Sequence, residues 1–391
     1  MSDRKPIPRF DNDYSVDAAQ QRRDFLQAET GADLSHIGRF SAPPESMAGN
    51  IENFIGALQM PLGVAGPCLI QGEHAEGWFY VPMATTEGTL VASYSRGMRV
   101  MSESGGIRCT VLNESMQRAP LFEFDNARDA RDFCQWMDEN MPAVAEQAES
   151  TSSVAKLIDI QRWPIARMVY TRFNFTTGDA AGQNMTSKAA RHACLWMLDN
   201  YPGKVKNFAL SGGIETDKKH SHMNLLHSRG KRVIAEAVVK RDVLEQRMRV
   251  TPEAVFKMRQ RSMLGAALAG SAYNGPHSAN GIAALFIATG QDEANVVESH
   301  TGLSFLDLTE EGDLYCSVTL PSVICATHGG GTGLPHQKEC LKLLGCEGKG
   351  KARKLAEIIG ATVLAGDLSL AAAIVADEWV SSHDKYGRNR P

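Results

Sequence analysis

The stretch IARMVYTRFNFTTGDAAGQN, residues 165–184, decides the fold class of this chain. Its first part, residues 165–175, alternates apolar and polar side chains as a β-strand does. The loop TTGDAAGQN follows, and a helical pattern then continues to about Asn200. A strand, a glycine-containing loop and a helix in this order leave free N–H groups at the helix N-terminus, where phosphates bind well. The Rossmann pattern G-x-G-x-x-G is absent, so the stretch predicts a phosphate-binding unit of another kind.

The chain changes character on both sides of this stretch. Residues 1–50 form a polar, partly helical arm that ends in the loop SAPPES, and residues 120–150 are acidic and helical in pattern. Glycine and proline crowd residues 51–67, which suggests backbone that turns tightly or approaches a ligand. A second glycine-rich stretch, ATHGGGTGLP at 326–335, could line the same ligand. The segment from Lys351 to about Ser381 predicts a helix broken near Gly366.

Composition limits the class of protein. The 391 residues are enough for two or three domains, and 43% apolar with 22% charged residues is typical of a soluble globular protein. A net charge of -4 argues against a nucleic-acid partner. The eight cysteines form no C-x-x-C pair, the N-terminus lacks a signal-peptide pattern, and no run approaches the roughly 20 apolar residues of a membrane span. We therefore expect a cytoplasmic protein with no membrane partner.

Two motifs look functional but are weak. GCEGKGKA at 345–352 nearly matches the P-loop, but Ala352 replaces the hydroxyl residue that binds Mg²⁺. The spacing of His220, His222 and His227 fits neither H-E-x-x-H nor a zinc finger. We expect surface histidines and no metal.

Glu87 lies in VPMATTEGTLVAS, residues 81–93, just ahead of four apolar residues at helical spacing from Leu90 to Met101. This spacing predicts that Glu87 lies in the first turn of a helix, where the helix dipole favours a carboxylate. An unpaired buried carboxylate is costly, so Glu87 must be solvated, paired or catalytic. From position alone, a structural and a catalytic role both remain open.

Eight short motifs follow one another over nearly the whole chain. They are ENFIG (52–56), PLGVAGP (61–67), PMATTEG (82–88), GDAAGQN (178–184), TDKK (216–219), GQD (290–292), GGGTGLP (329–335) and SSH (381–383). In this order they resemble the 3-hydroxy-3-methylglutaryl-coenzyme A (HMG-CoA) reductase family, in its catalytic portion without a membrane anchor. The pattern is more similar to the class that includes the eukaryotic enzymes than to the other bacterial class.

The resemblance implies an α+β fold. A large mixed α/β substrate domain, residues 51–119 and 210–391, would be interrupted by a small ferredoxin-like nicotinamide-binding domain at 120–209, with residues 1–50 as the N-terminal arm. It also implies a homodimer or higher homo-oligomer with active sites at the subunit interface. There the nucleotide loop around Asp179 would face the substrate site of the partner.

The implied reaction is the reduction of HMG-CoA to mevalonate by two NAD(P)H in succession, through a hemithioacetal and mevaldehyde. By resemblance, Lys218 would stabilise the oxyanion that each hydride creates, and Asp292 would keep this lysine charged and oriented. Glu87 would donate a proton in the second reduction, for which partial burial beside Asp292 would raise its pKa. His383 would protonate the departing CoA thiolate.

The resemblance also implies the binding residues. For the substrate they are Arg118, Ser211, Lys219, Arg261 and Asn280. Arg261 stands where the family normally has a lysine, and an arginine has a different reach. It could instead be a surface residue on the helix expected from about 253 to 268. The segment GSAYNGPHSAN, residues 270–280, also departs from the family's length and spacing.

For the cofactor the implied residues are Ser152, Ser153, Asp179, Gly182, Asn184, Gly331 and Thr332. Ser153, in STSSVAK at 150–156, stands where NADPH-using relatives have an arginine that binds the 2′-phosphate. Lys156 could supply a charge if this segment is helical. The family favours NADPH, and the missing arginine leaves NADH possible.

Two other functions remain open from the residues. The same fold could oxidise mevalonate with NAD⁺, because a catalyst accelerates both directions. A non-catalytic CoA-binding paralogue is the alternative from another class. The presence of Glu87, Lys218, Asp292 and His383 together argues against it.

Overall fold

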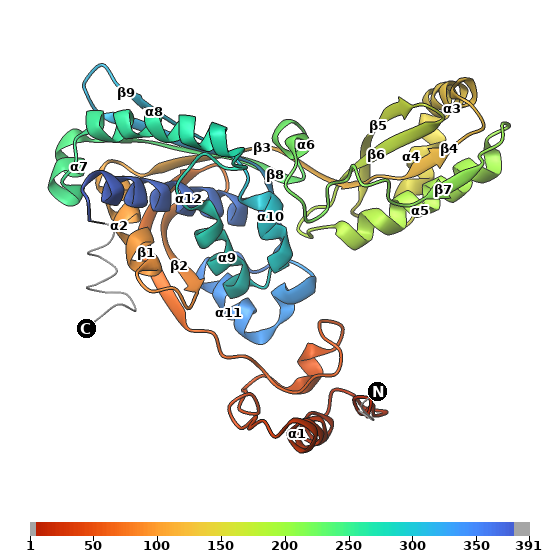
Figure 1. Cartoon of the computed structure of the whole chain (residues 1–391), viewed down its shortest axis with the longest axis horizontal. Helices are drawn as coiled ribbons and strands as arrows, with labels where there is room; N and C mark the ends of the chain where they lie inside the picture. The colour runs from red at the N-terminus through yellow and green to blue at the C-terminus, as the bar shows by residue number, and fades with distance from the viewer. Residues whose placement is uncertain (1–4, 379–391) are drawn as a thin grey trace.

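The computed structural model describes residues 5–378, which form a large unit, a smaller unit and an N-terminal arm (Figure 1). In chain order the elements are α1 (Val16–Thr30), η1 (Pro44–Met47), β1 (Leu62–Gly72), β2 (Glu76–Ala84), α2 (Leu90–Glu103), β3 (Ile107–Arg118), β4 (Leu121–Glu123), α3 (Ala127–Glu139), α4 (Met141–Glu149), β5 (Lys156–Ile165), β6 (Met168–Thr176), α5 (Gln183–Asn200), β7 (Asn207–Ala209), α6 (His222–Leu226), β8 (Gly230–Val239), α7 (Arg241–Met248), α8 (Pro252–Ala269), α9 (Ser278–Thr289), η2 (Glu293–Asn295), α10 (Val296–Ser299), β9 (Leu303–Leu308), β10 (Leu314–Val323), η3 (Gly330–Gly333), α11 (Pro335–Leu343) and α12 (Ala352–Val375).

Strand β3 connects the two units. In the large unit it pairs in parallel with β1 and antiparallel with β8, and its last residues, Met116–Arg118, pair antiparallel with β6 of the small unit. The strand order is β7-β4-β6-β3-β8-β10-β9, with the β1–β2 pair joined beside β3 and β5 beside β6. Arg118 therefore lies where the two units meet.

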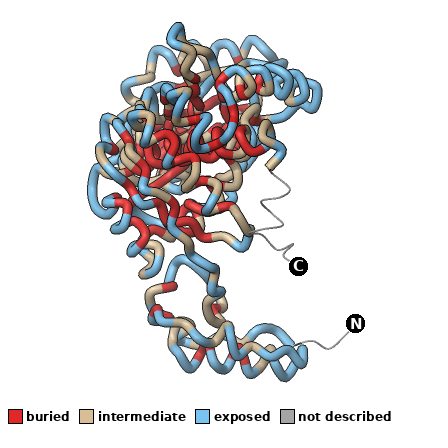
Figure 2. The backbone as a smooth tube through the Cα atoms, turned by 90° about the vertical axis from the view of Figure 1, so that its left-hand side faces the viewer, coloured by how far each residue is buried: buried red, intermediate tan, exposed pale blue. Residues whose placement is uncertain are grey.

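The large unit buries helix α12 against the sheet, together with α2 and α9, and the buried backbone in Figure 2 concentrates there. Glycines allow the close approach: a Cβ on Gly97 of α2 would lie 1.8 Å from the carbonyl oxygen of Ala365, and one on Gly366 would lie 2.3 Å from the ring of Tyr94. The predicted break near Gly366 is wrong, because this glycine makes room for Tyr94 and the helix continues through it.

Helix α12 also corrects the expectation that no apolar run reaches the length of a membrane span. Among the described residues it is the one helix long and apolar enough to cross a membrane. Within its most apolar window, 78% of the residues are buried inside the protein. That burial is typical of a core helix.

The small unit has the strand order β7-β4-β6-β5, and every neighbouring pair is antiparallel. Helices α3 and α4 connect β4 to β5, and α5 connects β6 to β7. This is the ferredoxin-like arrangement. Its separate core includes Phe122, Phe133, Phe173 and Met197. The predicted α+β fold with a ferredoxin-like unit is confirmed.

The stretch 165–175 is not one strand. Strand β5 ends at Ile165 and pairs with Met168, so Ala166 and Arg167 form a tight turn, with Ala166 at a φ of 53°. The strand expected from the alternation is β6. The helix predicted to about Asn200 is α5, and the helix predicted at about 253–268 is α8.

The N-terminal arm contacts the large unit near the glycine-rich loop. Its own small core includes Ala19, Met47 and Phe54, and Leu334 packs against it. The Ser41 hydroxyl lies 2.9 Å from Nε2 of His336. The arm thus rests on the segment that follows the glycines of GGGTGLP.

Candidate active site

An open cleft of about 560 Å³ lies beside the N-terminus of α5. It is lined by residues 180–185, by residues between 290 and 295, by residues between 324 and 337, and by Asn50 of the arm. Of the predicted site residues, the lining includes Gly182, Asn184, Asp292, Gly331 and Thr332. The volume is in the range of small-molecule sites.

The N-terminus of α5 is shaped for an anion. Gly182 precedes the helix with a φ of 87°, and a Cβ there would lie 2.2 Å from the side chain of Thr177. Only glycine fits this turn. The first N–H groups of a helix have no intrahelical partner, and together with the helix dipole they bind phosphates. The residues present at this end of the cleft fit the phosphates of a dinucleotide.

The glycine motifs of GQD and GGGTGLP touch one another. A Cβ on Gly290 would lie 2.3 Å from the carbonyl oxygen of Gly331, and one on Gly331 would lie 2.8 Å from that of Gly290. Backbone contact this close requires glycine on both sides. It brings Asp292, two residues after Gly290, to the same cleft as the glycine-rich loop.

Asp179 makes its polar contacts within the chain. Its carboxylate accepts hydrogen bonds from the main-chain N–H groups of Gly350 and Ala352, at 2.7 and 3.1 Å. Burial alone would raise the pKa of Asp179, but these N–H donors outweigh it and lower the pKa. The carbonyl oxygen of Asp179 accepts from Thr327 and His328. Asp179 therefore joins the loop between β6 and α5, which is the predicted cofactor loop, to the glycine-rich loop and to the start of α12.

The serine pair lies in a turn rather than in a helix. The Ser152 hydroxyl accepts from the N–H groups of Val154 and Ala155, and Ser153 is exposed. The turn borders the cofactor loop, because a Cβ on Gly178 would lie 3.1 Å from Val154. Residues 150–156 therefore do not form the helix that would let Lys156 supply a charge beside Ser153. Lys156 begins β5, and its ammonium lies 2.7 Å from Glu149.

The Lys218 ammonium and the Asp292 carboxylate form an ion pair at 2.9 Å. Asp292 itself caps the short helix η2 by accepting from the N–H of Ala294. The hydrogen bond to Asp292 is the largest influence on Lys218 and raises its pKa, so the ammonium form is stabilised. The pair brings the TDKK and GQD motifs together.

Three residues that the sequence analysis missed surround this pair. Arg229, which is 1% exposed, donates to the Asp217 carboxylate at 2.6 Å and lies 3.4 Å from Glu298. Glu298 is fully buried and accepts the main-chain N–H of Lys218 at 2.5 Å. Burial raises the pKa of the Glu298 carboxyl, against the opposing effect of that N–H. Asp217 lies inside TDKK, but no sequence pattern marks Arg229 or Glu298.

Glu87 lies before helix α2, not in its first turn. Thr89, with a φ of 70°, is the N-cap, and the helix begins at Leu90. The Glu87 carboxylate is exposed, and the amide of Asn280 donates to both of its oxygens at 3.2 and 3.0 Å. The partial burial expected for Glu87 is therefore wrong in the isolated chain. The contact does bring two predicted site residues together.

Arg118 and Ser211 meet at the junction of the two units. Arg118 lies 3.8 Å from Glu215 and donates to the Ser187 hydroxyl of α5 at 2.6 Å. The Ser211 hydroxyl donates to the same carboxylate of Glu215. These contacts group two of the predicted substrate-binding residues.

Lys219 is exposed, and its ammonium donates to the carbonyl oxygen of Asp217 at 3.0 Å. Arg261 is exposed on α8, and within residues 5–378 it forms no ion pair or hydrogen bond with another predicted site residue. His383 lies outside the described residues. The roles of these three residues stay predictions.

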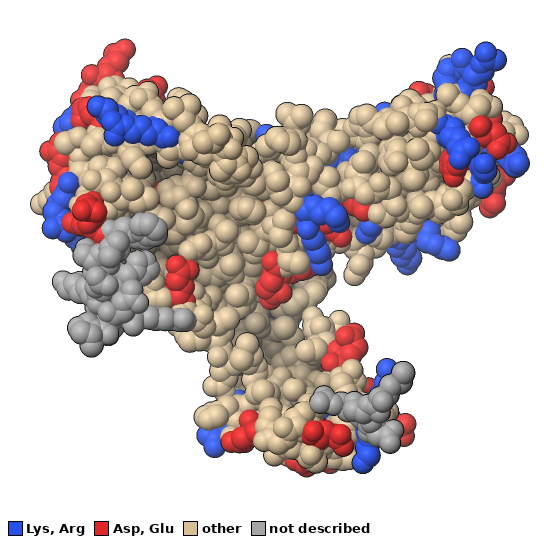
Figure 3. All heavy atoms as spheres, in the orientation of Figure 1, with Lys and Arg blue, Asp and Glu red and all other residues tan. Residues whose placement is uncertain are grey.

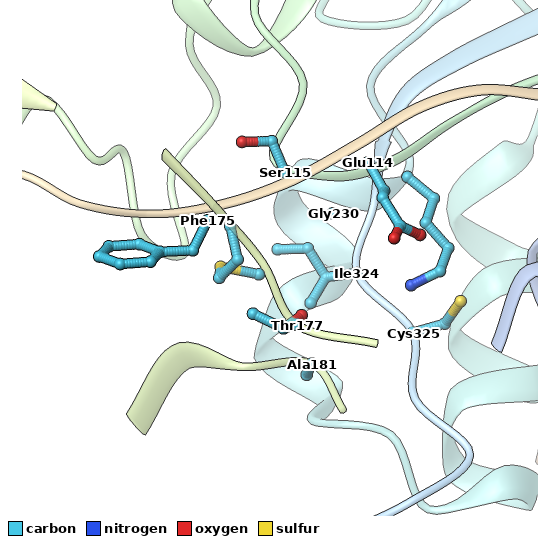
Figure 4. Close-up of a pocket in the computed structure, with 10 residues that line it drawn as sticks. Glu114, Ser115, Phe175, Thr177, Ala181, Gly230, Ile324 and Cys325 are labelled. Carbon is cyan, nitrogen blue, oxygen red and sulfur yellow. The ribbon is translucent and has the colours of Figure 1, made fainter. Parts of the chain in front are cut away.

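A second cavity lies where the end of β6 approaches β3 and the chain after β10 (Figure 4). Its lining includes Phe175, Thr177 and Ala181 of the small unit and Ile324 and Cys325 of the large unit. Its volume of about 10 Å³ is roughly that of one water probe. It marks tight packing between the units rather than a ligand site.

One group of described residues has the spacing of metal ligands: Glu73, His74 and Glu357. The buried carboxylate of Glu357 already accepts the main-chain N–H groups of residues 73–75. Its oxygens are thus used to fix the turn between β1 and β2.

Comparison with known proteins identifies the family. A profile of the hydroxymethylglutaryl-coenzyme A reductase family matches residues 18–388. The 3-hydroxy-3-methylglutaryl-coenzyme A reductase of Pyrococcus abyssi is 42% identical over 95% of this chain and 93% of its own length. The reductase of Methanocaldococcus jannaschii is 43% identical, again over 95% and 93%. Reductase 2 of Dictyostelium discoideum is 41% identical over 86% of this chain and 65% of its own length.

Among solved structures, the class II 3-hydroxy-3-methylglutaryl-CoA reductase from Streptococcus pneumoniae bound to NADPH has the same fold. The TM-score is 0.69 at 22% identity, over 91% of this chain and 86% of that chain. Fold, cleft and sequence similarity lead to one conclusion. The chain belongs to the hydroxymethylglutaryl-coenzyme A reductase family.

Proposed function

We propose that this protein reduces HMG-CoA to mevalonate with two equivalents of NADPH. The single observation that carries the proposal is the Lys218–Asp292 ion pair beside the cleft of about 560 Å³. Because Asp292 keeps the Lys218 ammonium charged, this ammonium can donate a hydrogen bond to the carbonyl oxygen of a substrate at the cleft. The overall reaction consumes HMG-CoA, two NADPH and two protons, and yields mevalonate, CoA and two NADP⁺.

The cofactor supplies a hydride in each of the two reductions. As a hydride reaches the thioester carbonyl, its oxygen gains negative charge, and the Lys218 ammonium stabilises that charge. Asp292 keeps Lys218 protonated, since it raises the lysine pKa. A preorganised charged donor of this kind lowers the barrier by about 3 kcal/mol or more.

The hemithioacetal then breaks its C–S bond, and the thiolate of CoA takes a proton from His383. The product aldehyde, mevaldehyde, remains at the site and is reduced by the second hydride. Glu87 donates the proton that completes the alcohol, with the Asn280 amide holding its carboxyl group. The two proton donors thus act on different atoms: His383 on the sulfur of CoA and Glu87 on the oxygen of the alcohol.

Arg118, Ser211 and Lys219 bind the free carboxylate of the substrate, and Arg261 completes the set. Support for this group comes from the junction, where Arg118 and Ser211 already share the Glu215 carboxylate. A guanidinium has five N–H donors, so Arg118 can hold a second carboxylate beside Glu215. Asp179, Gly182, Asn184, Gly331 and Thr332 hold the dinucleotide, with Ser152 and Ser153 at its 2′ position.

The large unit acts as the substrate domain, 51–119 and 210–391, and the small unit as the nicotinamide domain, 120–209. The protein works as a homodimer or larger assembly. Apolar side chains support this: Leu62 and Val64 of β1 and Trp78 and Tyr80 of β2 are 49 to 58% exposed on one sheet face. Figure 3 shows that Lys, Arg, Asp and Glu gather mainly at the ends of the molecule, with fewer charged side chains on the face between them. Exposed apolar side chains grouped on one sheet face, as on β1 and β2, are typical of protein interfaces.

The chain falls in the class that includes the eukaryotic enzymes. The 41% identity to the Dictyostelium discoideum reductase supports this, beside 22% with the class II enzyme of known structure. The pattern of motifs in the sequence also supports this class.

The proposal is tested by an absorbance assay of NADPH oxidation with HMG-CoA as substrate. We expect two NADPH oxidised for each HMG-CoA consumed, and mevalonate and CoA as products by mass spectrometry. A reverse assay with mevalonate, CoA and NAD⁺ measures the catabolic direction in the same preparation. No turnover in either direction, by protein that binds NADPH and is folded, would contradict the proposal and favour the non-catalytic paralogue.

A further inference from the structure

The segment Thr216–Lys218, which carries the proposed catalytic lysine, has an unfavourable backbone. Thr216 has a φ of 59° and Lys218 a φ of 53°, both in the left-handed region. Residues other than glycine seldom adopt this conformation, and β-branched threonine least of all. Such a conformation persists where the surrounding structure holds it, and it is often found at functional sites.

Three buried side chains hold this segment from the protein interior, one for each residue. Their exposed fractions are 1% or less, so solvent does not compete for the contacts. The contacts are the Thr216 hydroxyl to Asn224 at 2.6 Å, Asp217 to Arg229 at 2.6 Å, and the Lys218 N–H to Glu298 at 2.5 Å.

Lys218 is held at both ends by one stretch of chain. Helix α10 follows η2 directly, so Asp292 caps the start of one short helical stretch and Glu298 lies within it. Asp292 pairs with the side-chain ammonium, and Glu298 accepts from the main-chain N–H. Arg229, 3.4 Å from Glu298, supplies the counter-charge that a buried carboxylate needs. Because the main chain and the ammonium of Lys218 are both held, its side chain points in one direction.

We infer that Glu298 is a positioning residue for Lys218, with Arg229 as its counter-charge. Its carboxylate holds the left-handed backbone so that the ammonium meets Asp292 and the substrate oxygen. Without an acceptor at this distance, the segment relaxes to negative φ and the ammonium moves away from Asp292. The inference rests on the proposed reduction of HMG-CoA, because Lys218 acts there.

Two variants distinguish the position of the Glu298 acceptor oxygen from the charge of its carboxylate. Glu298→Gln keeps an acceptor oxygen at the same distance and loses the charge. Glu298→Asp keeps the charge and withdraws the oxygen by one methylene. Val297→Ala, at the neighbouring and more exposed position of α10, controls for general disturbance of this helix. Thermal unfolding and NADPH binding establish that each variant is folded.

We expect Glu298→Asp to lower kcat for HMG-CoA by about 30-fold or more, with the KM for both substrates within about 3-fold, because Lys218 acts on the transition state. We expect Glu298→Gln and Val297→Ala to stay within about 5-fold of the wild type in kcat. A kcat of Glu298→Gln near the wild-type value, with a low kcat of Glu298→Asp, shows that Lys218 requires the position of the acceptor oxygen and not its charge. A glutamine variant as impaired as the aspartate variant overturns the inference.

A second readout does not need turnover. The Lys218 ammonium is titrated by ¹³C NMR of labelled lysine, with the signal assigned from Lys218→Arg. The acidic groups that act on it are Asp292, Asp217 and Glu298. We expect its pKa to fall in Glu298→Asp, as the pair with Asp292 loosens, and to fall less in Glu298→Gln, which removes only the coulombic effect of the Glu298 charge. An unchanged pKa in Glu298→Asp contradicts the positioning role even if the protein does not reduce HMG-CoA. If the wild type does not reduce HMG-CoA but the Lys218 pKa changes in the variants as expected, only the proposed reaction is contradicted.

Discussion

The ammonium of Lys218 lies 2.9 Å from the carboxylate of Asp292, although both side chains remain open to solvent, at 44 and 37% exposure. An exposed ion pair contributes little to stability, on the order of 0 to 1 kcal/mol. Stability therefore does not account for the pairing of Lys218 with Asp292. A function that needs a charged and directed ammonium does.

The first prediction concerns the charge of Lys218. Asp292 raises the pKa of this lysine, so Asp292→Asn lowers it and the ammonium is lost at a lower pH. We expect the basic limb of the pH profile of kcat/KM to move to lower pH, with the acidic limb unchanged. Steady-state kinetics between pH 6 and about 10.5 measures this, with Asp307→Asn on β9 as the control. Superimposed basic limbs in wild type and Asp292→Asn would show that Lys218 is not the titrating group.

The second prediction concerns His383, which lies outside the described residues. Its proposed task is to protonate the CoA thiolate, so His383→Gln should reduce HMG-CoA turnover by about 10²-fold or more. Mevaldehyde reduction releases no thiolate and should change much less. Parallel assays with the two substrates test this. Equal losses on both would assign His383 another role.

The third prediction concerns cofactor selection. Ser153 is exposed in a turn that borders the cofactor loop, and Lys156 is already paired with Glu149. With no guanidinium at Ser153, we expect the wild type to favour NADPH over NADH weakly. Ser153→Arg should increase the preference about 10-fold or more, through a charge-assisted pair with the 2′-phosphate. The measurement is kcat/KM for both cofactors. A wild-type preference for NADPH above about 10³-fold would show that Ser153 is not the discriminating position.

The fourth prediction concerns stability. Burial raises the pKa of Asp367, in the middle of α12, to about 7, while the Tyr273 hydroxyl, the His277 N–H and Arg259 act in the opposite direction. The unfolded value is about 3.9. The folded state therefore keeps a proton that the unfolded chain releases, and the free energy of unfolding falls as pH rises from about 4 to 7.

Asp367→Asn cannot ionise and removes this dependence. We expect the stability of wild type relative to Asp367→Asn to fall by on the order of 1 to 4 kcal/mol between pH 5 and pH 8. Urea unfolding at both pH values gives the difference. Equal changes in the two proteins would show that Asp367 titrates at its ordinary pKa.

Sequence reasoning was most successful where motifs carry the chemistry. The glycines of GDAAGQN and GGGTGLP line one cleft, and Lys218 of TDKK meets Asp292 of GQD, although these segments lie far apart in the chain. Helix α5 follows from the pattern of the local sequence, whereas the ferredoxin-like order is expected only from the resemblance to the family. Short motifs mark positions where backbone geometry or charge permits few residues.

The errors come from packing, which no local pattern records. Gly366 has the pattern of a helix break, but it is buried against Tyr94 in a continuous helix. Ala166 interrupts an alternating run because the hairpin turns there with positive φ. Glu298 has no signal at all in the sequence. Its role depends on where α10 lies relative to Lys218, and only the folded chain determines that.

The most direct test of the central claim is Lys218→Ala, assayed by NADPH oxidation with HMG-CoA and, separately, with mevaldehyde. Both steps create negative charge on the carbonyl oxygen, so loss of the ammonium should cost about 3 kcal/mol or more in each, about 10²-fold in kcat. Lys240→Ala, an exposed lysine before α7, is the matched control and should retain wild-type rates. The account predicts that Lys218→Ala lowers kcat for both reductions by about 10²-fold or more while NADPH still binds. Retention of more than about a tenth of the wild-type activity on either substrate would contradict it.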